Sequence, residues 1–306
     1  MPIFKQNPHP SSLIERPAEE LLAAGTTMGA VELLVRDLDA MITFYNEGML
    51  LDVLQQTGEA AVLGKNSEPS VILRQVTDLP PFDPRGAGLF HTAILYGTET
   101  ELSAAVLNVA QRYPNSFTGT GDHIYSEAFY FNDPEGNGVE LYHDRPKDKW
   151  IREDNGLYAQ ATNPLDPNDY LQSHADQNAL NAANSTLGHV HLQVGDTGKA
   201  RDFYAGVLGF EVTGELDTVV FVAAGGYHHH IGLNVFRSKG AGPRAAAYGL
   251  GRVDIDVPTE ADRAALADRL KEHQVEAADD GRTLEFRDPW NSLIRVKSAT
   301  AEKLTV

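Results

Sequence analysis

One stretch of this 306-residue chain occurs twice, and this repeat constrains the fold more than any other feature. The sequence from Val35 is Val-Arg-Asp-Leu-Asp-Ala-Met-Ile-Thr-Phe-Tyr, and the sequence from Val194 is Val-Gly-Asp-Thr-Gly-Lys-Ala-Arg-Asp-Phe-Tyr. The Asp, Phe and Tyr that they share keep a constant spacing of 159 residues. An Asp-Pro turn at Asp133 likewise returns at Asp288. The pattern predicts two similar halves.

Each half divides again, so we expect four units, numbered here in chain order. In each unit a short alternating strand leads through a polar break into an amphipathic helix, and short β-rich runs follow. The first strands are expected at 30–35, 91–95, 189–194 and 253–257, and two later strands at 128–131 and 139–142. The helices are expected at 38–47, 98–112, 197–206 and 259–273, with Asp37, Thr98, Asp196 or Thr197, and Thr259 as N-caps. The sequence thus predicts an α+β fold of four βαβββ units.

These units define the expected domains. They are an N-terminal arm at 1–26, an N-terminal half at 27–146, a linker at 147–186, a C-terminal half at 187–298 and a tail at 299–306. The linker is rich in Asp, Asn, Pro and Ala and lacks strand periodicity. We therefore expect it to run over the surface, with one short helix near 169–174.

Composition excludes several classes of function. The formal net charge of −18 argues against nucleic acid or an anionic membrane as the main partner. The absence of Cys excludes disulfides, thiol nucleophiles and thiolate metal sites. No apolar run approaches the ~20 residues that cross a bilayer, and the polar N-terminal arm does not resemble a signal peptide. We expect a cytoplasmic protein in which imidazole, carboxylate or backbone oxygen would hold any metal.

Two His and one Glu occupy matching positions in units two and three. His91 and His189 each stand five residues before the end of a first strand, and Glu140 stands seven residues after Asp133. At the same places units one and four carry Ala30, Arg252 and Arg295. Two imidazoles and a carboxylate on one face leave half of an octahedral metal open, as in non-haem Fe(II) oxygenases. Because guanidinium cannot ligate a cation, the pattern predicts a metal site in units two and three alone.

Other residues offer alternatives. His191 lies on the same strand face as His189 and is an alternative ligand. If His228–His230 form a strand, the side chain of His229 points opposite to the other two. One interpretation is that two of the three are exposed and one packs. The other is that one of them acts as an acid or base beside the metal. His123 lies in a predicted loop and could simply be a solvated turn residue. Tyr130 could simply be a half-buried aromatic residue of a strand. Surface positions are expected for His9, His143, His174 and His273.

Several motifs resemble the vicinal oxygen chelate superfamily, which includes glyoxalases, bleomycin-resistance proteins and extradiol dioxygenases. They are the repeated Phe-Tyr helices, Val-Leu-Gly-Phe at 207–210 and Asp-Pro-Glu-Gly-Asn-Gly-Val-Glu at 133–140. Within that superfamily, this chain resembles the bacterial catechol 2,3-dioxygenase-like branch at residues 188–192, 225–234, 121–123 and 144–146. The similarity spans about 27–296 and implies cupped mixed sheets in two tandem halves.

The resemblance implies an extradiol dioxygenase that uses Fe(II), with Mn(II) as the alternative metal, to cleave a catechol-type aromatic diol with O₂. The implied metal ligands are His91, His189 and Glu140, and the implied groups around the diol are His229, His123 and Tyr130. His229 would take or return a proton, and the other two would hydrogen-bond the diolate. The family often forms homo-oligomers, although no sequence feature here specifies one.

Two other functions fit the same fold. A glyoxalase-type metal isomerase or lyase usually needs a fourth protein ligand, and unit three has no clear Glu in its last strand. A metal-free small-molecule binding (resistance) protein would need none of the three ligands. The better-known two-domain extradiol enzymes place the whole set in the C-terminal half, whereas here it falls in units two and three. We therefore expect unit two to pair with unit three, and unit one with unit four, which brings His91 close to His189.

Overall fold

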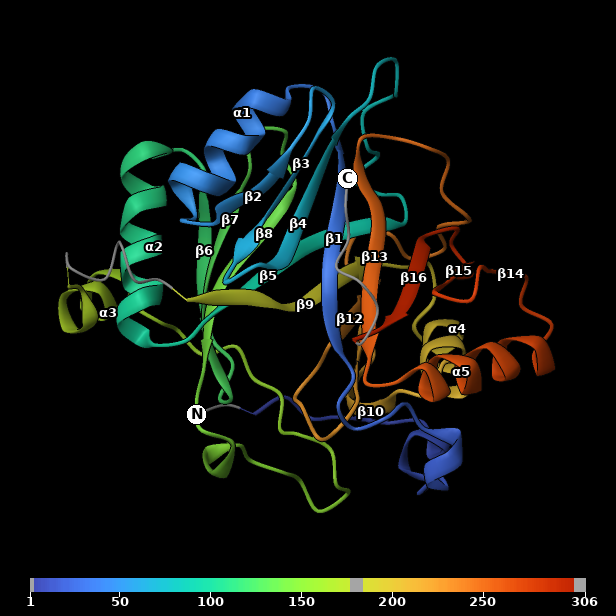
Figure 1. The fold of residues 1–306 in the computed structure, drawn as a ribbon. Coiled ribbons are helices and arrows are strands. Elements are labelled where there is room, and N and C mark those ends of the chain that lie inside the picture. The colour runs from blue at the N-terminus through green and yellow to red at the C-terminus, as the bar shows by residue number, and fades with distance from the viewer. Residues whose placement is uncertain (1–2, 177–183, 300–306) are drawn as a thin grey trace.

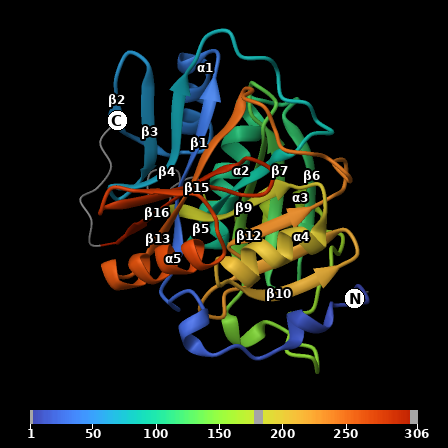
Figure 2. The same cartoon turned by 90° about the vertical axis from the view of Figure 1, so that its right-hand side faces the viewer.

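The structure is a computed structural model that describes residues 3–176 and 184–299. Its strands form two sheets of eight strands each, and the helices lie around the outside of these sheets (Figures 1 and 2). The first sheet contains, from edge to edge, β14 (Ala277–Asp279), β15 (Thr283–Arg287), β16 (Leu293–Ser298), β13 (Gly249–Val257), β1 (Thr27–Val35), β4 (Glu68–Gln75), β3 (Ala60–Lys65) and β2 (Asp52–Gln56). The second contains β10 (Glu211–Leu216), β11 (Val219–Ala223), β12 (Ile231–Asn234), β9 (Ser185–Gln193), β5 (Gly88–Tyr96), β8 (Gly138–Asp144), β7 (Ser126–Asn132) and β6 (Phe117–Asp122). The predicted α+β fold is confirmed.

Each sheet joins one unit from either half of the chain. Within every unit the first strand runs parallel to the last, as β5 does with β8 and β9 with β12. The free edges of the first strands then pair antiparallel, β1 with β13 and β5 with β9. This pairing removes an exposed edge from every unit. The predicted pairing of unit two with three and of unit one with four is confirmed, while the exact domain boundaries stay a prediction.

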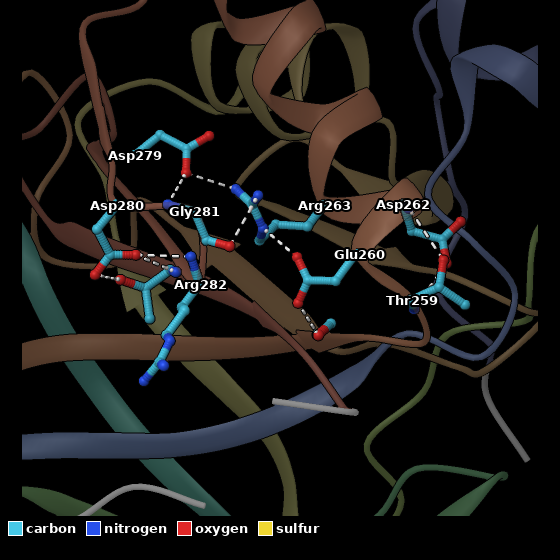
Figure 3. A network of polar contacts seen from close by, with 10 residues as sticks. Thr259, Glu260, Asp262, Arg263, Asp279, Asp280, Gly281 and Arg282 are labelled. Carbon is cyan, nitrogen blue, oxygen red and sulfur yellow. Dashed lines mark hydrogen bonds and ion pairs between the residues drawn. The ribbon is translucent and has the colours of Figure 1, made fainter. Parts of the chain in front are cut away.

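The helices that follow the first strands begin where the sequence predicts. They are α1 (Leu38–Thr43), α2 (Glu99–Arg112), α4 (Thr197–Arg201) and α5 (Glu260–Glu272). The N-cap side chains that accept backbone N–H bonds are Asp37, Thr98, Asp196 and Thr259. Thr259 forms a reciprocal capping box with Asp262 (Figure 3). In the next turn Arg263 contacts both Glu260 (2.9 Å) and Asp279 (2.7 Å), which ties α5 to β14.

Two of these helices end differently from the prediction. Both α1 and α4 widen into a π-helical turn, at Phe44–Gly48 and Asp202–Val207, instead of continuing as α-helix. In the first turn the N–H of Met49 donates to the carbonyl of Phe44 at 3.0 Å, five residues back. The turns carry the repeated Phe-Tyr pairs, whose side chains are buried. The same local distortion therefore occurs at equivalent points of units one and three.

The linker contains the predicted short helix, α3 (Pro167–His174), but it does not run only over the surface. Residues 157–161 are buried. Burial is tolerated because the backbone finds partners: the N–H of Tyr158 donates to the carbonyl of Thr213, and Asn163 bridges to Asp122. Short 3₁₀ turns occur at Pro10–Leu13, Ala18–Glu20 and Lys147–Lys149. Part of the predicted linker, 177–183, and the predicted tail beyond 299 lie outside the described residues.

No described helix is both long and apolar enough to cross a bilayer. The longest, α2, has 14 residues. One large core of buried side chains takes residues from both sheets and from the helices beside them. The middle strands of the second sheet, β5, β8 and β9, are positioned by this core, and they carry the residues that the sequence predicts as metal ligands.

Candidate metal centre

Strand register brings the three predicted ligands together. Ala93 on β5 pairs with Glu140 on β8 and with His189 on β9, so these two side chains flank β5 in one row. His91 lies two residues before Ala93 and therefore points to the same face. Directly before His189, a Cβ added to Gly188 would lie 1.8 Å from the hydroxyl oxygen of Tyr142, so only glycine fits there. The sheet thus directs two imidazoles and a carboxylate to one point.

The three side chains are buried and converge on one carboxylate oxygen. Oε2 of Glu140 lies 2.9 Å from Nε2 of His91 and 3.3 Å from Nε2 of His189. One potential ligand atom from each residue lies within 4.8 Å of the other two. Nε2 of His91 is buried and makes no hydrogen bond of normal geometry, although it lies close to this carboxylate oxygen. Two ring nitrogens and a carboxylate oxygen that converge in a buried place form a donor set that a bound cation would satisfy.

Protonation favours the same interpretation. Burial lowers the pKa of His189 to about 4, so this ring is neutral at pH 7. Burial disfavours the charge of Glu140, but the adjacent rings of His189 and His91 outweigh it and hold the pKa of the carboxyl well below its usual value. A neutral imidazole with a lone pair and an ionised carboxylate are the forms that bind a divalent metal.

The alternative ligand His191 also faces this side of the sheet. It pairs directly across from His91, and the two rings lie 4.9 Å apart. Glu140, however, stands in the row of His189 and contacts that residue instead. Burial lowers the pKa of His191 well below its usual value, so it is a neutral neighbour of the three-residue cluster.

The other predicted site residues lie around the same point. Nδ1 of His123 donates to the carbonyl of Ala161 at 3.0 Å, and its Nε2 lies 2.6 Å from the hydroxyl of Tyr130. The ring of Tyr130 lies 5.7 Å from that of His91. The ring of His229 lies 4.1 Å from that of His189. All six residues predicted for the site therefore border one region of the structure.

One of the two alternatives for the three consecutive histidines, that two are exposed and one packs, was wrong. His228–His230 form an irregular segment that ends where β12 begins, so strand alternation does not apply to them. All three are buried rather than two being exposed. They do point to different partners: Nδ1 of His230 accepts from the N–H of Ala224, whereas Nδ1 of His228 and of His229 lie 2.7 Å apart. The turn at Gly225 and Gly226, both with positive φ, starts this segment.

A cavity of about 180 Å³ opens beside the cluster, and sequence reasoning missed much of its wall. Phe4 comes from the N-terminal arm and Gln160 from the linker. The two segments are joined by a hydrogen bond of 2.7 Å from the N–H of Phe4 to the carbonyl of Gln160. Phe90 reaches the cavity because it occupies a β-bulge between Leu89 and His91. No local pattern announces these contacts, since they depend on how distant segments fold together.

The chain has recognisable relatives among known proteins. Residues 27–141 and 186–296 match the Glyoxalase/Bleomycin resistance protein/Dioxygenase superfamily. The chain is 33% identical over 270 residues to the catechol-2,3-dioxygenase of Bacillus subtilis (strain 168), covering 86% of this chain and 94% of that protein. The chain therefore belongs to the Glyoxalase/Bleomycin resistance protein/Dioxygenase superfamily, as its motifs predict. The family and this relative support an enzyme.

Two solved structures share the fold. A candidate dioxygenase from Bacillus subtilis subsp. subtilis str. 168 has a TM-score of 0.62 and 13% identity, over 90% of this chain and 85% of that one. Glyoxalase I from Zea mays has a TM-score of 0.55 and 17% identity, over 90% and 92% of the two chains. At these identities the likeness shows the fold alone, which is shared by enzymes of different reactions.

Proposed function

We propose that the protein is an extradiol ring-cleaving dioxygenase, which uses O₂ to cleave a catechol-type aromatic ring next to its vicinal diol. The observation that carries this proposal is the convergence of His91, His189 and Glu140 on one buried point beside an aromatic-lined cavity. The 33% identical relative named catechol-2,3-dioxygenase supports the same reaction.

The donor set fits a ferrous ion, with Mn(II) as the alternative. Two imidazoles and one carboxylate suit either metal and leave coordination positions open. His91, His189 and Glu140 would hold the ion, and the convergence of their ligand atoms in a buried place is consistent with that role. When bound, the metal would supply Lewis-acid and template chemistry for the diol and O₂.

The remaining residues would bind and orient the substrate. Phe90, Phe221 and Phe236 line the cavity, and their rings would pack against the aromatic face of the diol and exclude water. Tyr130, held by His123 at 2.6 Å, would hydrogen-bond one diol oxygen. His229 would accept a proton from the other hydroxyl, because burial lowers the pKa of His229 well below its usual value and keeps the ring neutral.

The register argues against a four-ligand glyoxalase-type site. Glu140 lies opposite Ala93, the residue two after His91. The equivalent position in unit three lies opposite His191, the residue two after His189, and it is occupied by Gly232. Glycine has no side chain to ligate a metal. Among the described residues this position therefore supplies no fourth ligand, which favours an enzyme that binds both a diol and O₂.

The proposal is tested by purifying the full-length protein without oxygen and measuring its iron and manganese. Catechol and O₂ are then added, and the yellow ring-fission product is followed by absorbance. We expect bound metal and product formation in the wild type, and loss of both in His91→Ala. His273→Ala, which changes an exposed residue, serves as the control. Full metal content and activity in His91→Ala would refute the site, and a metal-free wild type that binds catechol unchanged would favour a binding protein.

A further inference from the structure

A chain of buried hydrogen bonds leads away from the proposed metal ligands. Oδ1 of Asp144 lies 2.8 Å from Nε2 of His228, and Nδ1 of His228 lies 2.7 Å from Nδ1 of His229. The side chain of His228 is fully buried, whereas that of Asp144 is 17% exposed. Asp144 stands at the end of β8, four residues after Glu140 and on the same strand face.

We propose that Asp144, acting through His228, determines which ring nitrogen of His229 carries the proton. A neutral imidazole has one N–H and one lone pair, and a carboxylate only accepts. In a neutral His228 the contact with Asp144 therefore places the single proton on Nε2. Its Nδ1 then holds only a lone pair, so the hydrogen in the Nδ1–Nδ1 contact must belong to His229. The structure thus assigns His229 as the Nδ1–H tautomer.

This tautomer leaves Nε2 of His229 without a proton. His229 lines the cavity, and with Nδ1 engaged by His228 its Nε2 is the nitrogen left for a bound molecule. An unprotonated Nε2 accepts a hydrogen bond or a proton from a diol hydroxyl. This consequence rests on the proposed function, but the tautomer itself does not. Asp144 and His228 are positioning residues, since neither lines the cavity.

The surroundings hold the chain in place. The ring of His228 stacks on Tyr125 with ring centres 4.4 Å apart and planes 13° from parallel. Oδ2 of Asp144 accepts from the hydroxyl of Tyr227 at 2.8 Å, and that hydroxyl lies 2.8 Å from the hydroxyl of Tyr142. Both carboxylate oxygens of Asp144 are therefore engaged, and the His228 ring cannot rotate without breaking the stack and two hydrogen bonds.

The test is ¹⁵N NMR of the full-length chain, as purified without added metal and labelled at histidine. Spectra are recorded at pH 8, above the ordinary imidazole pKa of about 6.5. The ring nitrogens of His229 are assigned by comparison with His229→Gln. Nitrogens with and without a proton have well-separated resonances, so each spectrum reports the tautomer directly. We expect wild-type His229 to carry its proton on Nδ1 and His228 on Nε2.

Two variants test the role of the carboxylate. In Asp144→Asn the amide nitrogen can donate to Nε2 of His228, so we expect His229 to lose its single tautomer and gain a proton on Nε2. Tyr227→Phe removes a hydrogen bond to Asp144 but keeps the carboxylate, and should keep the wild-type tautomer.

A wild-type His229 protonated on Nε2, or a His228 protonated on both nitrogens, overturns the proposal even if a variant does not fold. An unchanged tautomer in Asp144→Asn also overturns it. Because NMR reads the tautomer without turnover, failure of the dioxygenase assay would not produce either result.

Discussion

The hydroxyl of Tyr45 donates a hydrogen bond of 3.1 Å to Oδ2 of Asp133, which joins unit one in the first sheet to unit two in the second. Tyr204 makes the same contact with Asp288 at 3.0 Å, from unit three to unit four. The two motifs that reveal the repeat in the sequence are therefore partners in the structure. Each pair bridges the two sheets, and the π-helical turns place the tyrosines that form them.

This buried contact predicts a pH-dependent stability. Burial raises the pKa of Asp133 to about 6, although hydrogen bonds from Asn137, Glu135 and Tyr45 oppose the rise. An unfolded Asp has a pKa of about 3.9, so between pH 4 and 6 the folded state binds more protons and the free energy of unfolding falls as pH rises. The contribution of Asp133 is fully present below pH 4 and declines by about 3 kcal/mol as pH rises through 6.

Urea unfolding of the wild type and of Asp133→Asn at several pH values from 4 to 7 measures this contribution. The stability of the wild type relative to the variant should fall across that range, because the amide does not titrate. Taking the difference cancels the other carboxyl groups, among them Asp288, whose pKa burial also raises. A difference that stays constant from pH 4 to 7 would show that Asp133 does not titrate as predicted.

Single substitutions of the two histidines on β9 should identify which of them binds the metal. We expect His189→Gln to lose bound Fe(II) or Mn(II), because Glu140 contacts His189. His191→Gln alters a buried histidine on the same strand face but should keep most of the metal. Metal content is measured by elemental analysis after anaerobic loading, with circular dichroism to confirm folding. The reverse result, with metal lost only from His191→Gln, would make His191 the ligand.

Removal of one hydroxyl should slow turnover without removing the metal. Tyr130→Phe takes away the partner of His123 and one hydrogen bond to the proposed diol, which predicts a roughly 10- to 100-fold lower kcat. The ligands are untouched, so metal content should stay at the wild-type level. Steady-state oxygen consumption with catechol measures the effect. An unchanged kcat would remove Tyr130 from the proposed mechanism.

The cavity should select uncharged substrates. None of the described residues that line it is Lys or Arg, so no cationic side chain there can pair with a substrate carboxylate. A substrate carboxylate would lose its hydration without gaining a cationic partner, which costs at least ~2–3 kcal/mol. We therefore expect kcat/KM for 3,4-dihydroxybenzoate to be roughly 100-fold or more below that for 4-methylcatechol. Equal values in a competition assay would contradict the proposed substrate class.

Much of the fold and of the candidate metal site follows from the sequence because the information is local. Strand alternation, helix N-caps such as Thr259 and the register of His91 within a repeat depend on residues close in the chain. Asp144 could also have been noticed, since it lies on the strand face of Glu140 at a spacing of four residues. The cavity wall could not, because Phe4, Phe90 and Gln160 reach it through an arm, a bulge and a linker.

The four repeated units, the family resemblance and the three residues that converge on one buried point were predicted from the sequence alone, since repetition and periodicity leave a pattern in any single chain. Only the tertiary structure decided that His228–His230 are all buried, that His189 rather than His191 contacts Glu140, and that a hydrogen-bonded chain joins Asp144 to His229. These contacts depend on a bulge, a turn and the approach of strands from different halves of the chain. Such geometry follows from the packing of distant segments, and no local pattern records it.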